Sequence, residues 1–220
     1  MKQHAGAQSI AFAEPPIILS AACVGGKREA EGPLAASFDE LETKTKFGQK
    51  TWEAAESEMQ RRAFTAALQK LALDAVDLDA VFAGDLLNQC ISSTFSLRDA
   101  AVPVLGLYGA CSTMAEGLCL AAMTVSGGFA SRAAVLTSSH FASSERQYRF
   151  PLGYGGQRTP TAQWTVTGSG CAILGSGGHG PRILRATIGR IVDRGITDPN
   201  NMGAAMAPVS VKLRPYPMRN

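Results

Sequence analysis

The chain has 220 residues, 45% of them apolar and 18% charged, and a formal net charge of +3. This composition is that of a globular protein with one sizeable core or two small ones, and it excludes an intrinsically disordered chain. Because no run of lysine and arginine is interleaved with aromatic residues, we expect no nucleic-acid partner.

The cysteines and the N-terminal sequence indicate the redox compartment of the chain and its relation to membranes. Five cysteines are scattered without C-x-x-C spacing or neighbouring paired histidines: Cys23, Cys90, Cys111, Cys119 and Cys171. This pattern argues against a metal site and a disulfide framework, and it favours a reducing compartment. No signal-peptide core follows Met1, and no apolar run approaches the roughly 20 residues of a transmembrane helix, so any membrane association should be peripheral.

Strand and helix signals alternate through the first hundred residues. Residues 1–14 are small and polar and should be loosely held, and residues 17–19 begin a buried strand. Residues 51–71 have the spacing of an amphipathic helix, with acidic side chains in the first half and basic ones in the second, as the helix macrodipole favours. Residues 80–84 then form a short buried strand, and residues 92–100 are weakly helical.

Polar side chains follow the strand at residues 80–84. They are Asp85, Asn88 and Gln89, a carboxylate and two amides. Ligand groups in α/β sheets usually lie at the carboxyl edge of parallel strands, so these residues are candidates for ligand binding. Asp85 has an alternative role as the cap of the helical segment that follows, and the sequence leaves both roles open.

A cysteine follows the next predicted strand, at residues 103–108. Thr113 and Glu116 have the spacing of a capping box, which would begin a helix two residues after Cys111 and carry it to Gly127. The thiol would then lie beside the unpaired amides of the first turn, where the helix dipole favours a thiolate and the amides can hold an anion or an oxyanion. A buried structural cysteine at a tight junction is the alternative.

A further buried strand at residues 133–137 leads to His140. This histidine is a weak candidate for a catalytic base, against the alternative of a structural histidine with satisfied hydrogen bonds. Residues 141–160 predict a long loop with three arginines, including Arg158, and loops of this length are usually functional. We expect it to cover a pocket or to form a dimer contact.

The remaining residues complete an α/β pattern. Residues 163–174 and 183–192 predict a strand pair joined by a glycine-rich turn. The alternation of strand and helix before them predicts right-handed crossovers and a mixed, mainly parallel sheet covered by helices. Residues 1–208 would form this domain, and residues 209–220, with two prolines and three basic side chains, an irregular basic tail.

Several short strings together resemble the stage V sporulation protein AD family of the thiolase-like superfamily. The resemblance runs from about Gln8 to Pro208 and rests on residues 83–89, 109–113, 137–140, 154–158, 161–163, 166–170, 195–199 and 201–203. It implies a thiolase-like fold. Because the superfamily repeats this half in a second, similar half, the chain would correspond to the N-terminal portion, and we interpret it as C-terminally truncated.

The resemblance implies a sporulation protein that binds dipicolinic acid, free or calcium-chelated, for its uptake into the developing spore. It also implies a homodimer, peripheral to the spore inner membrane, that works with other stage V sporulation membrane proteins. The ligand pocket would involve Asp85, Cys111 and Ser112, and Asn88 and His140 are further candidates for ligand contacts. No cofactor is expected other than the calcium of a chelated ligand.

The chemistry of the ligand agrees with these residues. Dipicolinate is a rigid aromatic dianion, which suits the amides of Ser112 and Thr113 and a nearby arginine such as Arg158. A chelated calcium would give the Asp85 carboxylate an ion to coordinate. The alternative is an acyltransferase with Cys111 as nucleophile. The superfamily's second half supplies a histidine that this chain lacks, which favours the binding protein over the enzyme.

Overall fold

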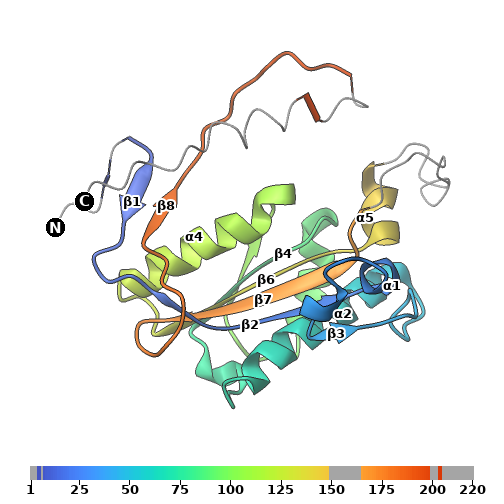
Figure 1. The fold of residues 1–220 in the computed structure, drawn as a ribbon, viewed down its shortest axis with the longest axis horizontal. Helices are drawn as coiled ribbons and strands as arrows, with labels where there is room; N and C mark the ends of the chain where they lie inside the picture. The colour runs from blue at the N-terminus through green and yellow to red at the C-terminus, as the bar shows by residue number, and fades with distance from the viewer. Residues whose placement is uncertain (1–3, 6, 149–164, 199–202, 205–220) are drawn as a thin grey trace. The chain divides into compact units, whose positions relative to one another are not determined.

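The chain divides into two compact units, Met1–Thr187 and Ile188–Asn220. The computed structural model describes residues 4–5, 7–148, 165–198 and 203–204. Within the second unit, residues 188–198 form neither helix nor strand. The helices and strands around the core belong to the first unit (Figure 1). The predicted tail at residues 209–220 lies outside the described residues, so the predicted domain boundary stays a prediction.

The core of the first unit is a six-stranded mixed sheet with the order β3-β2-β7-β6-β4-β5. Its strands are β2 (Ile17–Gly25), β3 (Glu40–Leu41), β4 (Ala80–Gly84), β5 (Val104–Leu107), β6 (Arg132–Ser139) and β7 (Gly168–Gly175). β4 runs parallel to β5 and β6, and β2 runs parallel to β3, whereas β7 is antiparallel to both of its neighbours. The α/β class with a mixed sheet, as predicted, is confirmed.

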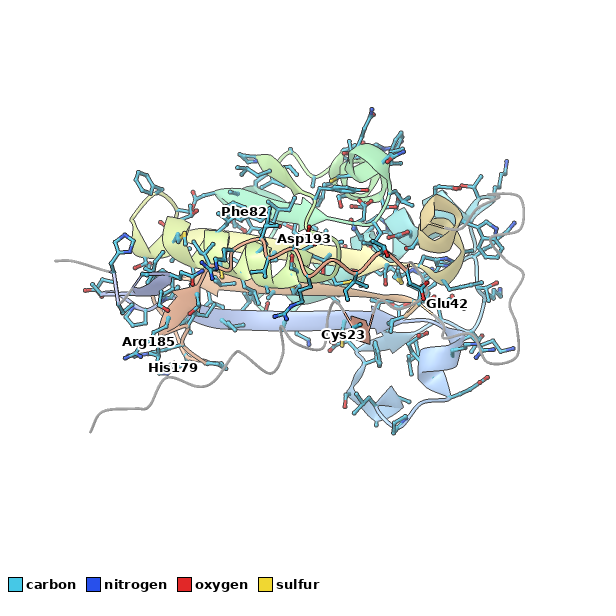
Figure 2. The ribbon with its side chains drawn as sticks, turned by 90° about the horizontal axis from the view of Figure 1, so that it is seen from above. Cys23, Glu42, Phe82, His179, Arg185 and Asp193 are labelled. Atoms are coloured by element: carbon cyan, nitrogen blue, oxygen red, sulfur yellow. The ribbon has the colours of Figure 1, made fainter. Side chains whose placement is uncertain are left out.

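Helices cover both faces of this sheet (Figure 1). α2 packs with α3 on one face and α4 packs on the other, each over its own apolar cluster. Phe82 of β4 belongs to the cluster beneath α4 (Figure 2). The helices are α1 (Lys27–Ala30), α2 (Trp52–Gln69), α3 (Ile91–Leu97), α4 (Thr113–Ser126) and α5 (Phe141–Tyr148). Among the described residues, no helix combines the length and apolar character that crossing a bilayer requires.

α2 begins and packs as its sequence predicts. The Thr51 side chain accepts a hydrogen bond from the Ala54 amide at 3.1 Å, which caps the first turn. Ala55, Met59 and Ala63 are fully buried at spacings of four residues, so they form the stripe that faces the sheet. The small alanines bring the helix backbone close to the strands.

α4 lies close to the sheet because two glycines lack side chains. A Cβ atom at Gly84 would collide with the Thr113 methyl group and the Leu107 carbonyl oxygen, and one at Gly117 would collide with Val135. The start of α4 therefore rests against the end of β4, and its second turn rests against β6. Both contacts depend on glycine.

The predicted pairing of the last two strands is wrong. β7 does not pair with the strand that follows it, β8 (Arg185–Thr187), but lies between β2 and β6. β7 is buried on both faces over most of its length, and such a strand belongs in the middle of a sheet. β8 instead pairs with β1 (Ser9–Ala11), so part of the predicted loose N-terminus is also ordered as a strand.

The predicted loop at residues 141–160 begins as a helix instead. α5 occupies Phe141–Tyr148, and residues 149–164, including Arg158, lie outside the described residues. The sequence of α5 has no apolar stripe. Among the side chains that the structure describes in α5, residues 141–144, the buried ones are Ala142, Ser143 and Ser144, so polar contacts replace the apolar periodicity that would have predicted a helix.

Candidate functional site

The topology brings the predicted candidates to one edge of the sheet. Because β4, β5 and β6 are parallel, their carboxyl ends meet there. Asp85 follows β4, the turn with Cys111 follows β5, and His140 follows β6. This is the edge at which α/β sheets usually bind ligands.

The Cys111 turn, Ala110–Ser112, is a single turn of 3-10 helix that continues directly into α4. Ala110 has a left-handed backbone with φ of 47°, a conformation that costs energy for a residue with a side chain. Cys111 and Ser112 are exposed at the beginning of the 14-residue helix, so the alternative of a buried structural cysteine is wrong.

The predicted capping box between Thr113 and Glu116 is not formed. Ser112 occupies the N-cap position without a side-chain capping bond. The Thr113 hydroxyl instead donates to the Ala110 carbonyl at 2.8 Å and accepts from the Gly109 amide at 3.2 Å, so it is used by the preceding turn.

The amides expected to bind an anion already have partners in the Cys111 turn. The Ser112 amide donates to the Gly109 carbonyl at 3.0 Å, and the Thr113 amide donates to the Ala110 carbonyl. The Ser112 hydroxyl also donates to the Gly109 carbonyl, at 2.7 Å. What the turn offers to a ligand is therefore the exposed thiol, the exposed hydroxyl and the positive end of the helix dipole.

Asp85 stabilises the loop that follows β4. It is 2% exposed, and one carboxylate oxygen accepts from the Leu87 amide at 2.8 Å. The other accepts from the Ser93 amide at 2.8 Å and the Ser93 hydroxyl at 2.7 Å. Because Ser93 lies in the first turn of α3, these contacts support the capping alternative. Asn88 is exposed nearby in a turn that continues through the left-handed residues Gln89 and Cys90.

His140 is a buried histidine with both ring nitrogens engaged. Nε2 lies 2.8 Å from the Thr45 carbonyl, and Nδ1 accepts from the Ala142 amide at 3.2 Å, which assigns the proton to Nε2. Its ring stacks on Phe141 at 4.9 Å and lies 5.5 Å from Trp52. Burial lowers its pKa from the usual 6.5. These contacts support the structural alternative rather than a catalytic base.

A cavity of about 240 Å³ lies at the same edge, beyond β2 and β6. Its lining includes Lys27, Arg28 and Glu29 from α1, together with Phe141 and Thr167. One oxygen of Glu29 accepts from the Thr167 amide at 3.0 Å. Nothing in the sequence places the charges of α1 beside an aromatic ring, so the sequence gives no signal for this cavity.

Sequence reasoning missed a buried polar cluster beneath α2. The Glu56 cluster comprises Glu56, Gln60, Ser93, Ser138 and Ser143. Glu56 is fully buried, and its carboxyl oxygens lie 2.8 Å from the Ser138 hydroxyl and 2.5 Å from the Ser143 hydroxyl. The Gln60 amide nitrogen donates to Ser138 at 2.8 Å and to Ser93 at 3.1 Å, and Ser93 links the cluster to Asp85.

Burial raises the pKa of Glu56 to about 7, although the two serine hydroxyls oppose the shift. One sequence signal pointed to this acid. Glu56 and Gln60 are four residues apart and adjoin the buried positions Ala55 and Met59, so they interrupt the apolar stripe of α2 with polar groups.

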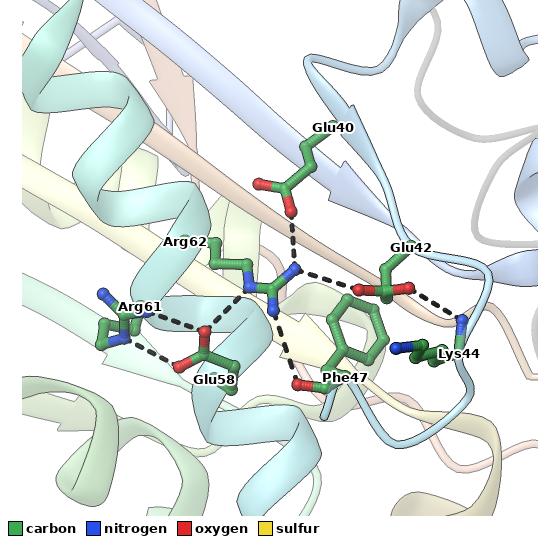
Figure 3. Close-up of polar contacts among 7 residues, drawn as sticks. All are labelled: Glu40, Glu42, Lys44, Phe47, Glu58, Arg61 and Arg62. Atoms are coloured by element: carbon green, nitrogen blue, oxygen red, sulfur yellow. Dashed lines mark hydrogen bonds and ion pairs between the residues drawn. The ribbon is translucent and has the colours of Figure 1, made fainter. Parts of the chain in front are cut away.

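An ion-pair cluster fixes α2 to β3 and to the segment that follows it (Figure 3). The Arg62 guanidinium lies 2.6 Å from Glu40, 2.8 Å from Glu58 and 3.4 Å from Glu42. It also lies over the Phe47 ring, at 5.6 Å from its centroid. This cluster lies on the surface of α2, and its role is to position the helix that carries Glu56.

Comparison with known proteins identifies the relatives of the chain. The sequence profile of the family described as stage V sporulation protein AD matches residues 6–214. The stage V sporulation protein AD of Bacillus subtilis (strain 168) is 43% identical over 205 residues, which cover 93% of this chain and 61% of that protein. The chain thus spans about three fifths of the length of this relative.

Solved condensing enzymes are similar at a lower level. A 3-oxoacyl-(acyl carrier protein) synthase III from Xanthomonas oryzae is 14% identical, with a TM-score of 0.48, over 76% of this chain and 57% of that one. The corresponding synthase from Aquifex aeolicus is 15% identical, with a TM-score of 0.49, over 73% and 53%. Likeness at this level says nothing about the chemistry of the present chain.

Proposed function

Because the chain belongs to the stage V sporulation protein AD family, we propose that it binds dipicolinic acid for uptake into the developing spore. Its scaffold is the thiolase-like one that the sequence motifs predicted. The chain spans about three fifths of the length of the Bacillus subtilis relative. The activity of a full-length family member is therefore proposed for this chain and not assigned to it. The ligand is bound as the free dianion or as its calcium chelate.

One observation carries the placement of the ligand. Cys111 and Ser112 are exposed at the start of α4, at the carboxyl edge of the parallel strands. The positive end of the helix dipole favours a dianion there. Lys27 and Arg28 lie beyond β2 at the same edge, together with Glu29 and Glu31.

Calcium enters this proposal as part of the ligand and not as a resident metal. Both carboxylate oxygens of Asp85 accept hydrogen bonds within its loop, so we no longer assign them to calcium. Among the described residues, no three histidine, cysteine, aspartate or glutamate side chains gather as a metal site. The carboxylates of dipicolinate would themselves hold the ion, because calcium prefers oxygen ligands.

Direct titration tests the binding proposal. Isothermal titration of dipicolinate, with and without calcium, should give saturable binding. Ser112→Asp should weaken it more than about tenfold, because it adds a negative charge beside the dianion. Ser176→Asp is the matched control, since Ser176 is exposed at the opposite edge of the sheet. This variant should bind dipicolinate as the native chain does.

Two results would contradict this placement. Absence of saturable binding at millimolar ligand would end the proposal. If Lys27→Ala loses dipicolinate binding and Ser112→Asp retains it, the ligand binds in the cavity beside Phe141 and not at the Cys111 turn.

Acyl transfer is the second candidate function, and only the exposed thiol of Cys111 favours it. His140 does not support it, because both of its ring nitrogens are already engaged. Mass spectrometry after incubation with acyl-coenzyme A distinguishes the two functions. A stable adduct that Cys111→Ser removes and Cys23→Ser retains would favour the enzyme, whereas binding of dipicolinate without an adduct favours the binding protein.

The proposal includes a homodimer at the spore inner membrane, with other stage V sporulation membrane proteins as partners. β5 is an edge strand with exposed apolar side chains, 43% at Val104 and 48% at Leu105. Unprotected edges of this kind pair readily with a second strand. Leu105→Lys should therefore weaken self-association in analytical ultracentrifugation. Val76→Lys, at an apolar position that is even more exposed (70%), should leave it unchanged.

A further inference from the structure

Glu56 is a buried carboxyl group without a cationic partner. It is fully buried on the sheet-facing side of α2. Among the residues that the structure describes, no lysine or arginine forms an ion pair with it. A buried carboxylate without a compensating charge is costly, so the neutral form is favoured.

The hydrogen bonds of the Glu56 cluster accommodate either protonation state of the carboxyl group. Ser138 accepts from Gln60 at 2.8 Å, so its own hydroxyl proton is directed to Glu56 Oε1. A proton on Oε2 would be donated to Ser143 Oγ, and the Ser143 hydroxyl proton would then reach the His140 carbonyl at 3.5 Å. Every hydrogen has an acceptor in this arrangement. When Glu56 is ionised, Ser143 donates to Oε2 instead, and the His140 carbonyl retains the Ser144 amide as its donor at 3.0 Å. The two serine bonds then favour the anion, but burial and the acidic neighbours outweigh them.

The ionisable groups that face Glu56 also disfavour its charge. Asp85 at the end of β4 and Glu53 on α2 both raise its pKa by repulsion, and burial contributes most, which brings the value to about 7. His140, at the end of β6, is itself buried and has a lowered pKa. The described side chains of α5, residues 141–144, carry no ionisable group.

Ser143 connects this carboxyl group to the first turn of α5. The same turn contacts α2 through Phe141, whose ring lies 5.6 Å from that of Trp52. Ser144 completes the junction by accepting from the His140 amide at 3.2 Å. We propose that the protonation of Glu56 controls the docking of the first turn of α5 on α2: the neutral carboxyl group holds the turn, and ionisation weakens its attachment.

This inference goes beyond the proposed function and does not depend on any ligand. On ionisation, the proton passes from Oε2 to water and leaves a buried anion between two acidic neighbours. The Ser143 bond stabilises this anion less than water does, so undocking of the turn, which lets water reach the anion, becomes more favourable. α5 therefore becomes more mobile as pH rises, while the remaining strands and helices keep their packing.

Hydrogen exchange of the full chain, read by NMR from pH 5.5 to 8, tests the inference. The protection factors of the α5 amides should fall roughly 30-fold across this range, because the docked turn binds a proton that the released turn does not. The carboxyl carbon signal of Glu56 should titrate over the same range. In a Trp164→Phe background, Trp52 fluorescence should change in parallel, since Trp52 contacts Phe141.

Two variants separate this device from a general effect of pH. Glu56→Gln keeps the shape and cannot ionise, so α5 protection should stay high and flat with pH. Glu58→Gln, on the same helix, removes ion pairs with Arg61 and Arg62 that lie outside the Glu56 cluster, and it should retain the pH dependence of the native chain. Ser143→Ala should reduce that dependence by cutting the link to α5, which provides a test if Glu56→Gln fails to fold.

Flat α5 protection in the native chain, or a Glu56 carbon signal that titrates near pH 4.5, would overturn the inference. An equal pH dependence in Glu56→Gln would do the same.

Discussion

The Cys111 turn and the Glu56 cluster lie near the carboxyl ends of the same strands, but they are built in opposite ways. In the Cys111 turn, Gly109, Ala110, Ser112 and Thr113 bond to one another within five residues, and the outer side chains are exposed. In the Glu56 cluster, the bond to Ser143 joins residues 87 positions apart and is buried. Locally closed turns leave side chains free for ligands, whereas long-range buried networks determine how helices are held.

The largest expected effect on the free energy of unfolding concerns Asp85, which connects the Glu56 cluster to the loop after β4. Asp85→Ala would leave the Leu87 amide, the Ser93 amide and the Ser93 hydroxyl buried without an acceptor. We expect the free energy of unfolding to fall by about 4 kcal/mol, since each unsatisfied group costs about 1–3 kcal/mol. Urea denaturation measures this loss.

Asp99→Ala is the control for that variant, because the Asp99 side chain is 87% exposed. It should change the free energy of unfolding by less than about 0.5 kcal/mol. Equal losses in the two variants would show that Asp85 does not hold its loop as described.

The second effect is a dependence of stability on pH. The folded chain holds the Glu56 proton with a pKa of about 7, against an ordinary value of 4.5. Between these values the folded chain binds more protons than the unfolded chain, so the free energy of unfolding falls as pH rises through this window and then levels off. The contribution lost is about 3 kcal/mol.

The difference between native chain and Glu56→Gln isolates this contribution. His140 acts in the opposite direction, because its lowered pKa costs stability as pH falls, and it is present in both chains. Urea midpoints at pH 5 and pH 8 should favour Glu56→Gln over the native chain only at the higher pH. The same difference at both values would contradict the assignment.

The smallest effect compares one serine from each region. Ser143→Ala removes a buried hydroxyl bonded to Glu56 and should cost about 1–2 kcal/mol at pH 6. Ser112→Ala removes an exposed hydroxyl bonded within its own turn and should cost less than about 0.5 kcal/mol. Thermal or urea denaturation of the pair measures how far the two regions differ. A reversed order would mean that the Cys111 turn, not the cluster, limits stability.

Elements with local signals could be predicted from the sequence. The helix at residues 51–71 is confirmed as α2 because Thr51 caps it and its apolar residues repeat at helical spacing. The strand at residues 80–84 is confirmed as β4, and the helix after Cys111 as α4. The family was also predictable, because short strings such as residues 109–113 are specific in combination.

Features that depend on distant partners could not be predicted. The position of β7 between β2 and β6 depends on which strands need burial on both faces. The glycine-rich segment after β7 has the composition of a hairpin turn, which led to the wrong prediction. α5 is a helix that is attached to α2 through a buried hydrogen bond of Ser143 and has no apolar stripe. For the site, the sequence identified Asp85 and His140 but could not decide between ligand contacts and structural roles, since their partners are contributed by other segments.

Two glycines, one at the end of β4 and one within α4, make the position of the Cys111 thiol depend on the sheet. Gly84 seats the first residue of the helix and Gly117 seats its second turn, so the helix has little room to slide or tilt. A methyl group at either position would push α4 away from the sheet and displace Cys111 together with the helix. Substitutions in the interior can therefore change the position of the exposed end of this helix without altering any residue at that end.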